Sequence, residues 1–280
     1  MTKVPSFLLT VFVLVVFAGM LSSCRKSDRN SDTDLQNARD MSLAYACWND
    51  LVRQLNVFAS SQPDVNATPG PSVNVACGTI AVTPALPNPT FPKIGVIDYG
   101  STNCEGTDGA TRKGQLIASF TGNFRDSLTV ITITTNNYYV NGNKVDGTFT
   151  ITNKGRNAAG HPLYTDKTTD AVFTYSNGKK VDWKGTQTRE MIQGDTTALI
   201  FDDVYQLSGT AVGTGSDGNL LNAYISQPLI FSMDCPWIKS GTLYLDPANL
   251  GNRFINFGTG DCDNKASVWI FGGNFPLYLY

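Results

Sequence analysis

The sequence predicts a mainly β fold, with antiparallel β-sheets arranged as a sandwich or a half-barrel and one amphipathic α-helix before them. Two observations predict the sheets: a cysteine-bounded segment occurs twice, and apolar and polar residues alternate in runs between the two copies. The helix is predicted by apolar residues that recur at helical spacing ahead of the first copy. We expect a signal peptide at 1–23, a tether at 24–33, the helix at 34–59, a linker at 60–71 and the β domain at 72–280.

The N-terminal segment has the features of an export signal. Lys3 precedes an almost unbroken apolar run over 7–20, which is short for a membrane span and normal for a signal peptide. The sequence LSSC at 21–24 resembles the lipobox of bacterial lipoproteins, which implies that Cys24 carries a lipid and becomes the mature N-terminus. The alternatives are an ordinary signal peptide and an N-terminal anchor helix. Arg25 follows, where inner-membrane retention would favour Asp, so the outer membrane is the expected destination.

The predicted helix has a start signal and one apolar stripe. Thr33 and Gln36 fit a capping box that would begin it. The plain expectation is that the stripe packs on the β domain, and the alternative is that it binds a partner helix. Cys47 lies at the edge of the stripe and is expected to be a buried small hydrophobe rather than a reactive thiol. The stripe consists of Ala38, Met41, Tyr45, Trp48, Val52 and Leu55.

The duplicated unit covers 77–124 and 235–275. The two copies share the separation of their cysteines, and the sequence IDYG at 97–100 corresponds to INFG at 255–258. Glycine inside a strand pattern marks a bulge or a close backbone approach, which would fix the direction of the aromatic residue before it. We therefore expect these two aromatic residues, a tyrosine and a phenylalanine, to be buried in equivalent places. The competing view makes them an exposed stacking platform.

Equal spacing in both copies indicates that each cysteine pair closes on itself, Cys77 with Cys104 and Cys235 with Cys262. The alternative is a zinc site, which needs cysteines or histidines in closely spaced pairs. The sequence has no C-x-x-C motif, and His161 is its only histidine. Disulfides persist in an oxidising compartment, which agrees with export.

Alternating residues predict strands in the β domain. Apolar and polar side chains alternate over 148–152 and 171–175, as in sheets with one wet face. Asn-Gly dipeptides at 141–142 and 177–178 predict tight hairpin turns, because both residues tolerate positive φ angles. No helix is expected within 72–280.

Composition excludes several function classes. The formal net charge is −2 and no basic patch occurs, so no nucleic-acid partner is expected. With one histidine, catalytic triads and histidine-based metal sites are nearly excluded, and no cofactor is predicted. A glycosidase needs only two carboxylates. Asp202 and Asp203 would point to opposite faces of a strand, although either could pair with Glu190; solvated carboxylates are the plainer interpretation.

Calcium is a weak further candidate. Asp246, Asp261 and Asp263 surround the second cysteine of the later copy, and clustered carboxylates can hold this ion. The positions equivalent to Asp261 and Asp263 in the first copy are Asn103 and Glu105, and no DxDxDG loop is present. We therefore expect no metal.

The tryptophans offer one more possibility. Trp183, Trp237 and Trp269, with the many tyrosines, could form platforms on which sugars stack. Large aromatic residues in a β-rich chain are more often core residues or cross-strand pairs.

Taken together, the lipobox, the polar tether and the repeated Ile-[Asp/Asn]-aromatic-Gly segments resemble β-rich envelope lipoproteins of Bacteroidetes-type bacteria. The resemblance implies an outer-membrane-anchored lipoprotein on the periplasmic or cell-surface side. It would act as a non-enzymatic binding or structural module whose partner is a glycan, a lipid or an envelope protein. Two alternatives stay open: a carboxylate-dependent hydrolase acting on glycans, and a lipid-binding half-barrel carrier, which demands a large apolar cavity. No catalytic residues are implied.

Overall fold

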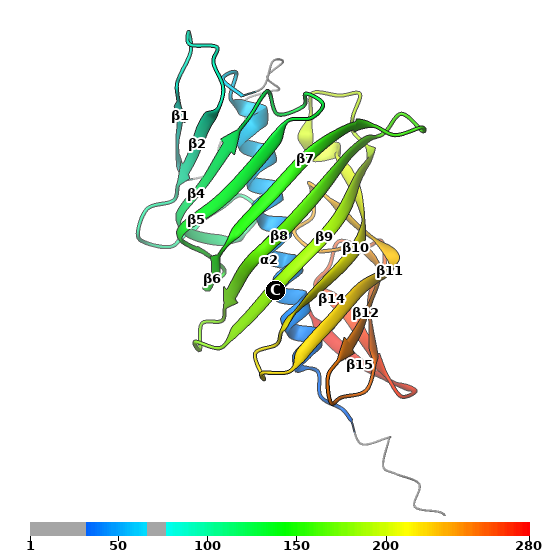
Figure 1. Cartoon of the computed structure of the whole chain (residues 1–280). Helices are drawn as coiled ribbons and strands as arrows, with labels where there is room; N and C mark the ends of the chain where they lie inside the picture. Colours follow the sequence, from blue (N-terminus) through cyan, green and yellow to red (C-terminus); the bar gives the residue numbers. More distant parts are fainter. Residues whose placement is uncertain (1–31, 66–76) are drawn as a thin grey trace, which may run out of the picture. The chain divides into compact units, whose positions relative to one another are not determined.

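In the computed structural model, which describes residues 32–65 and 77–280, one antiparallel sheet curves around the helix α2 (Figure 1). The predicted mainly β class with a preceding helix is confirmed. The arrangement is a single curved sheet rather than a two-sheet sandwich. Its elements are α2 (Gln36–Ser61), β1 (Thr79–Thr83), β2 (Lys93–Asp98), β3 (Cys104–Glu105), β4 (Thr111–Phe120), β5 (Val130–Val140), β6 (Asn143–Asp146), β7 (Thr148–Arg156), β8 (Pro162–Thr174), β9 (Lys180–Gln193), the 3-10 turn η1 (Ile200–Asp202), β10 (Val204–Thr214), β11 (Leu220–Ser232), β12 (Ser240–Pro247), β13 (Arg253–Thr259), β14 (Lys265–Ile270) and β15 (Gly273–Tyr278).

Neighbours along the chain are mostly neighbours in the sheet. The strand order runs β1-β2-β4-β5-β6-β8 and then in sequence from β9 to β15, with β3 beside β4 and β7 between β5 and β8. Both predicted hairpins form. Asn141 and Gly142 have φ angles of 49° and 79° between β5 and β6, and Gly178 has a φ of 84° between β8 and β9. These turns join the strands without crossovers.

The sheet has an inner face, which packs on α2, and an outer face. On β7, Phe149 and Ile151 are buried on the inner face, while the threonines between them are only partly covered. The Phe149 ring stacks on Trp48 of α2, with ring centroids 5.6 Å apart. The period-2 pattern of the sequence therefore separates the core from the wet face as predicted.

The helix differs from its prediction in two respects. The capping box does not form; the Asp34 carboxylate accepts the backbone N–H of Gln36 instead, at 2.7 Å. The predicted apolar stripe is buried against the sheet, which leaves no room there for a partner helix. The polar side of α2 is buried as well, including Asp40, Asp50 and Gln54. It is therefore a central helix enclosed by the sheet and the disulfide segments, not an amphipathic helix with one wet face.

Both predicted disulfides are present. Cys77 and Cys104 have Cα atoms 6.0 Å apart, and Cys235 and Cys262 have Cα atoms 5.7 Å apart. Cys47 is buried in α2 and, within the described residues, is the free cysteine. Burial, with a smaller effect from the Asp50 carboxylate, raises the pKa of its thiol well above the usual value. A neutral, enclosed thiol is not reactive, in agreement with the expectation from the sequence.

The aromatic residues of the two copies behave as predicted. Tyr99 and Phe257 are both buried. The glycines that follow them, Gly100 and Gly258, have φ angles of 76° and 95°, in the region that favours glycine. The alternative of an exposed platform at these two positions is wrong.

The copies do not form two halves of the fold. They supply β1–β4 and β12–β15 at the two ends of the strand order, and β5–β11 lie between them. Their first strands also pair differently. In the first copy, Ile80 of β1 lies opposite Ile97 of β2. In the second copy, the chain after Cys235 turns before it enters β12, and Leu243 of β12 lies opposite Ile255 of β13. The duplication fixes the cysteines and the buried aromatic residue, and not the register of the first strand.

Several predictions fall outside the described residues: the signal peptide at 1–23, Cys24, most of the tether and part of the linker. Among the helices that are described, none has the length and apolarity required to cross a bilayer.

Candidate functional site

Four aromatic side chains form a row across the outer face of β11–β14. Tyr224 lies opposite Tyr244, Tyr244 opposite Phe254, and Phe254 opposite Trp269. The ring centroids are 4.6, 5.0 and 6.0 Å apart along the row. Each ring therefore contacts the next, and the row spans four adjacent strands. We call these four residues the aromatic row.

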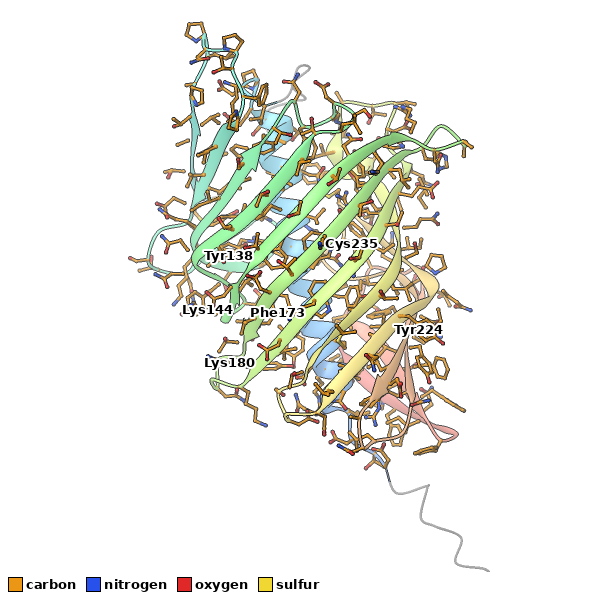
Figure 2. The ribbon with its side chains drawn as sticks, viewed as in Figure 1. Tyr138, Lys144, Phe173, Lys180, Tyr224 and Cys235 are labelled. Atoms are coloured by element: carbon orange, nitrogen blue, oxygen red, sulfur yellow. A yellow bond between two sulfur atoms is a disulfide. The ribbon has the colours of Figure 1, made fainter. Side chains whose placement is uncertain are left out.

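Strand alternation places the row on the outer face. The residue next to each ring in the chain points inward and is buried: Ala223, Leu243, Ile255 and Val268. Successive side chains of a strand point to opposite faces, so the four rings point away from α2. Figure 2 shows Tyr224 on the outer side of β11.

The two ends of the row are the most exposed. Tyr224 and Trp269 keep 45% and 47% of their surface in contact with solvent, while Tyr244 and Phe254 between them are half-buried by their neighbours. The Phe254 ring is tilted by 67° against Tyr244 and by 57° against Trp269. Such edge-to-face contacts hold the rings in fixed orientations.

Polar side chains flank the row on both sides. On one side Asn222 lies opposite Asp246, and on the other Asn256 lies opposite Thr242 and Ser267. These pairs stand on the same strands as the rings, two residues away, and therefore on the same face. The row is a strip of apolar surface one side chain wide between two lines of hydrogen-bonding groups.

The charge on this surface is low. Among the outward positions of β11–β14, all of which are described, only Asp246 and Lys265 carry charge. Shielding by the neighbouring rings, followed by the nearby Asp246 carboxylate, raises the pKa of Tyr244 above its ordinary value. The phenol is therefore neutral at neutral pH and can both donate and accept a hydrogen bond.

A hollow on the outer surface adjoins the row. It has a volume of about 510 Å³ and shares Asn222 with the polar line beside Tyr224. Exposed side chains of Lys184, Val212 and Leu220 line it. A second hollow of about 340 Å³ shares Lys184 and Val212 with the first. The depression thus continues from the row across β11 toward β8.

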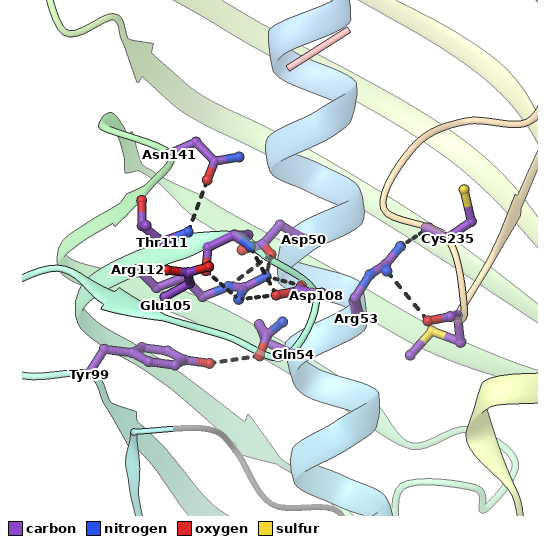
Figure 3. A network of polar contacts seen from close by, with 12 residues as sticks. Asp50, Arg53, Gln54, Tyr99, Glu105, Asp108, Thr111, Arg112, Asn141 and Cys235 are labelled. Atoms are coloured by element: carbon purple, nitrogen blue, oxygen red, sulfur yellow. Dashed lines mark hydrogen bonds and ion pairs between the residues drawn. The ribbon is translucent and has the colours of Figure 1, made fainter. Parts of the chain in front are cut away.

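A second polar cluster lies inside the molecule, where α2 meets β4 and β5 (Figure 3). Asp50 on the helix accepts a hydrogen bond from Arg112 Nε at 3.0 Å and from the Tyr138 hydroxyl at 2.5 Å. Asp108 Oδ2 lies 2.6 Å from Arg112 Nη2. Burial acts to lower the pKa of Arg112, but the two carboxylates outweigh burial and raise it above its usual value.

Arg53 extends the cluster to the second disulfide segment. Its guanidinium donates to the backbone carbonyls of Ser232, Met233 and Cys235. Burial lowers the pKa of this guanidinium, against the attraction of Asp50 and the other nearby carboxylates. From the first disulfide segment, the Tyr99 hydroxyl donates to Gln54 at 2.8 Å. The helix is therefore tied by hydrogen bonds to both copies of the duplicated unit.

The interior cluster holds α2 against the sheet and is not a ligand site. The cavity beside it, lined by Cys47, Asp50 and Arg112 among others, measures about 40 Å³, which is space for roughly one water. The side of the sheet that a half-barrel carrier would offer to a lipid is filled by α2. The structure therefore gives no support to the carrier alternative.

The calcium candidates do not come together. Asp246 stands near the end of β12 that pairs with the start of β13, whereas Asp261 and Asp263 follow the far end of β13. The Asp263 carboxylate accepts a hydrogen bond from the backbone N–H of Lys265 at 3.0 Å. In the described part of the chain no three His, Cys, Asp or Glu side chains are grouped so as to hold a metal. The geometry gives no support to the calcium candidate, because Asp246 and the other two carboxylates lie near opposite ends of β13 in the hairpin.

The carboxylates considered for hydrolysis are separated too. Glu190 is on the outer face, where His161 Nδ1 lies 2.6 Å from its Oε1, and this hydrogen bond is the main cause that lowers the pKa of Glu190. Asp203 is completely buried, which raises its pKa to about 7. Asp202 is exposed, but it ends the 3-10 turn η1 and Asp203 follows it before β10 begins, so the expectation that both residues stand on one strand is wrong. Glu190 points outward from β9 and Asp203 is completely buried, so the two carboxylates do not form a pair that one substrate could reach.

The tryptophans divide between the two interpretations. Trp183 is a core residue, with its ring centroid 5.8 Å from that of Tyr45, and Trp237 is half-buried. Trp269 belongs to the aromatic row. Sequence reasoning missed the other members, although a signal existed: Tyr224, Tyr244 and Phe254 each occupy the polar phase of an alternating strand.

Comparison with protein-family models, with curated proteins and with solved structures finds no match to this chain.

Proposed function

We propose that this protein is a lipid-anchored lipoprotein of the outer membrane that acts as a non-enzymatic binding module. The aromatic row is its binding face. The observation that carries the proposal is that four aromatic rings, two of them nearly half exposed, stand in register on the outer face of the sheet. The lipobox sequence at 21–24 supports the anchor.

Binding fits this geometry better than catalysis does. Exposed rings cost hydration free energy unless a ligand covers them, and a row bordered by polar side chains is typical of a surface that orients a ligand. Of the carboxylates considered for a hydrolase, Glu190 points outward from β9, whereas Asp203 is completely buried between η1 and β10. The interior is occupied by α2 and its hydrogen bonds.

The anchor is tested by Cys24→Ala in the full chain. We expect the parent to enter the detergent phase in a phase-partition experiment and the variant to stay in the aqueous phase or remain unprocessed. Equal partition of both chains into detergent would show that Cys24 is not the anchor.

Binding is tested through Trp269. Trp48 and Trp183 are buried and Trp237 is half-buried, so Trp269, with 47% of its surface exposed, is the tryptophan most open to acrylamide. We expect purified outer-membrane or cell-wall fractions to protect the lipidated protein from quenching. Trp269→Phe keeps an aromatic ring in the row and serves as the control, because it removes the contribution of Trp269 to the quenched fluorescence and retains the surface. Quenching of the parent that neither fraction changes would refute the binding function.

A further inference from the structure

We infer that the aromatic row binds a neutral linear polysaccharide that lies across strands β11–β14. This inference rests on the proposed binding function and names its ligand. A pyranose ring has an apolar face of C–H groups and an edge of hydroxyls. The first can stack on an aromatic ring, and the second requires hydrogen-bond partners at the sides. The outer face of β11–β14 offers both.

The row has the length and spacing of a short stretch of such a polymer. Its centroids are 4.6–6.0 Å apart, close to the length of one sugar unit. Three strand spacings give a row about 14 Å long, which covers roughly three or four sugar units. The two most exposed rings, Tyr224 and Trp269, stand at the two ends of the row, so successive units of one chain can reach both.

The polar lines supply partners for hydroxyl groups. Asn222 and Asn256 each offer amide donors and an acceptor, and Thr242 and Ser267 offer hydroxyls that do both. A sugar hydroxyl is itself donor and acceptor, so it needs side chains of this mixed kind. Asp246 adds one carboxylate, which can accept from a pair of neighbouring hydroxyls.

Other occupants fit the surface less well. A stable protein interface buries about 800 Å² on each partner around a wide apolar centre, and the row is one side chain wide. Nucleic acid and anionic lipid surfaces need clustered Lys or Arg, and Lys265 is the basic residue that β11–β14 present on this face. An uncharged chain with hydroxyl edges agrees with both the width and the charge.

The adjoining hollow gives a longer chain further contacts. A polymer that passes Tyr224 reaches Asn222 and then the depression lined by Lys184, Val212 and Leu220. We therefore expect affinity to rise with chain length beyond the stretch that covers the row.

The experiment uses the full lipidated protein in phosphatidylcholine vesicles. Fluorescently labelled cello-, chito-, xylo- and malto-oligosaccharides, each as disaccharide and hexasaccharide, are mixed with the vesicles and their co-sedimentation is measured. The variants are Trp269→Ala and Tyr224→Ala. The matched control is Tyr278→Ala, which removes an aromatic residue that is 67% exposed on β15 and outside the row. Thermal melts of all variants check that the fold is intact.

We expect at least one series to bind, with the hexasaccharide bound more tightly than the disaccharide. Trp269→Ala and Tyr224→Ala should each weaken binding about tenfold, as the loss of a stacking contact and its apolar surface would, and Tyr278→Ala should change it by less than about twofold. The inference is overturned if no series binds the parent, or if Tyr278→Ala weakens binding as much as Trp269→Ala. Protection of Trp269 by envelope fractions without binding of any oligosaccharide would reject the polysaccharide and leave the binding function standing. Absence of both would reject both.

Discussion

Replacing Asp50 with alanine should destabilise the fold more than any change on the outer face. The carboxylate accepts hydrogen bonds from Arg112 Nε at 3.0 Å and from the Tyr138 hydroxyl at 2.5 Å, and all three side chains are buried. Its removal leaves the Tyr138 hydroxyl without this partner and leaves Arg112 with Asp108, whose side chain is 20% exposed. Breaking one side of a buried ion pair costs about 3–5 kcal/mol because the other charge stays buried.

The effect is large enough to measure directly. Domains are stable by about 5–15 kcal/mol, so Asp50→Ala would remove a large part of the free energy of unfolding. In urea, a loss of this size shifts the midpoint by roughly 1–2 M. Tryptophan fluorescence follows the transition, since Trp48 on α2 and Trp183 on β9 are both buried. The matched control is Asp126→Ala, which removes a carboxylate without an ion pair to Arg112.

The double variant Asp50→Ala/Arg112→Leu distinguishes the interaction energy of the Asp50–Arg112 pair from the effects of losing each side chain alone. If the cost of Asp50→Ala comes from the stranded guanidinium, replacing that guanidinium with an apolar side chain should recover part of the stability. A single-variant cost below about 1 kcal/mol would refute the reasoning, as would a double variant whose loss equals the sum of the two single losses.

Two further predictions concern buried residues. Burial raises the pKa of Asp203 to about 7, so the folded state holds its proton while the unfolded state releases it near the ordinary pKa of 3.8. The contribution of this group to stability is therefore lost as pH rises through that window, by up to about 4 kcal/mol. In urea titrations, Asp203→Asn should be more stable relative to the parent at pH 8 than at pH 5. The control Asp202→Asn, which changes the exposed neighbour, should show no such pH dependence. Identical pH profiles of stability for Asp203→Asn and the parent would contradict the burial argument. Phe257→Ala should lower the free energy of unfolding by about 3–5 kcal/mol, because the ring is 2% exposed, and thermal melts measure the loss. Phe271→Ala, at a residue that is 43% exposed, should lower it little. An unshifted melting midpoint for Phe257→Ala would contradict the place of this ring in the core.

The fold could be predicted from the sequence wherever a local pattern determined it. Period-2 alternation located strands such as β7, and Asn-Gly located the hairpin turn at 141–142, because each depends on a few adjacent residues. The disulfides followed from the equal spacing of two cysteine pairs. The curvature of the sheet around α2 could not be predicted. It depends on the twist angle between adjacent strands, and the alternation of apolar and polar residues carries no information on that angle.

The polar face of α2 shows why helical periodicity misled. A stripe of apolar residues opposite polar ones ordinarily means one face in the core and one in water. Here Asp50, Arg53 and Gln54 find their partners on β4, on the backbone carbonyl of Cys235 and on Tyr99, all far away in sequence. A helix side that is polar because it is solvated and one that is polar because it is hydrogen-bonded inside a protein have the same sequence pattern. Only the partners distinguish them.

The aromatic row was missed for the opposite reason. Tryptophan alone does not reveal the row, because Trp183 is buried and Trp237 is half-buried. Aromatic residues are favoured in strands on either face, so residue type alone does not say which are exposed. The position of a residue in the strand alternation does say which are exposed. In β13 the buried residues Ile255 and Phe257 mark the positions that point inward, and Phe254 occupies a position that points outward. A large aromatic residue in the polar phase of one strand is ordinary, but four of them on adjacent strands at the same register are a continuous surface. That register is a property of strand pairing, and it is the feature on which the proposed binding face depends.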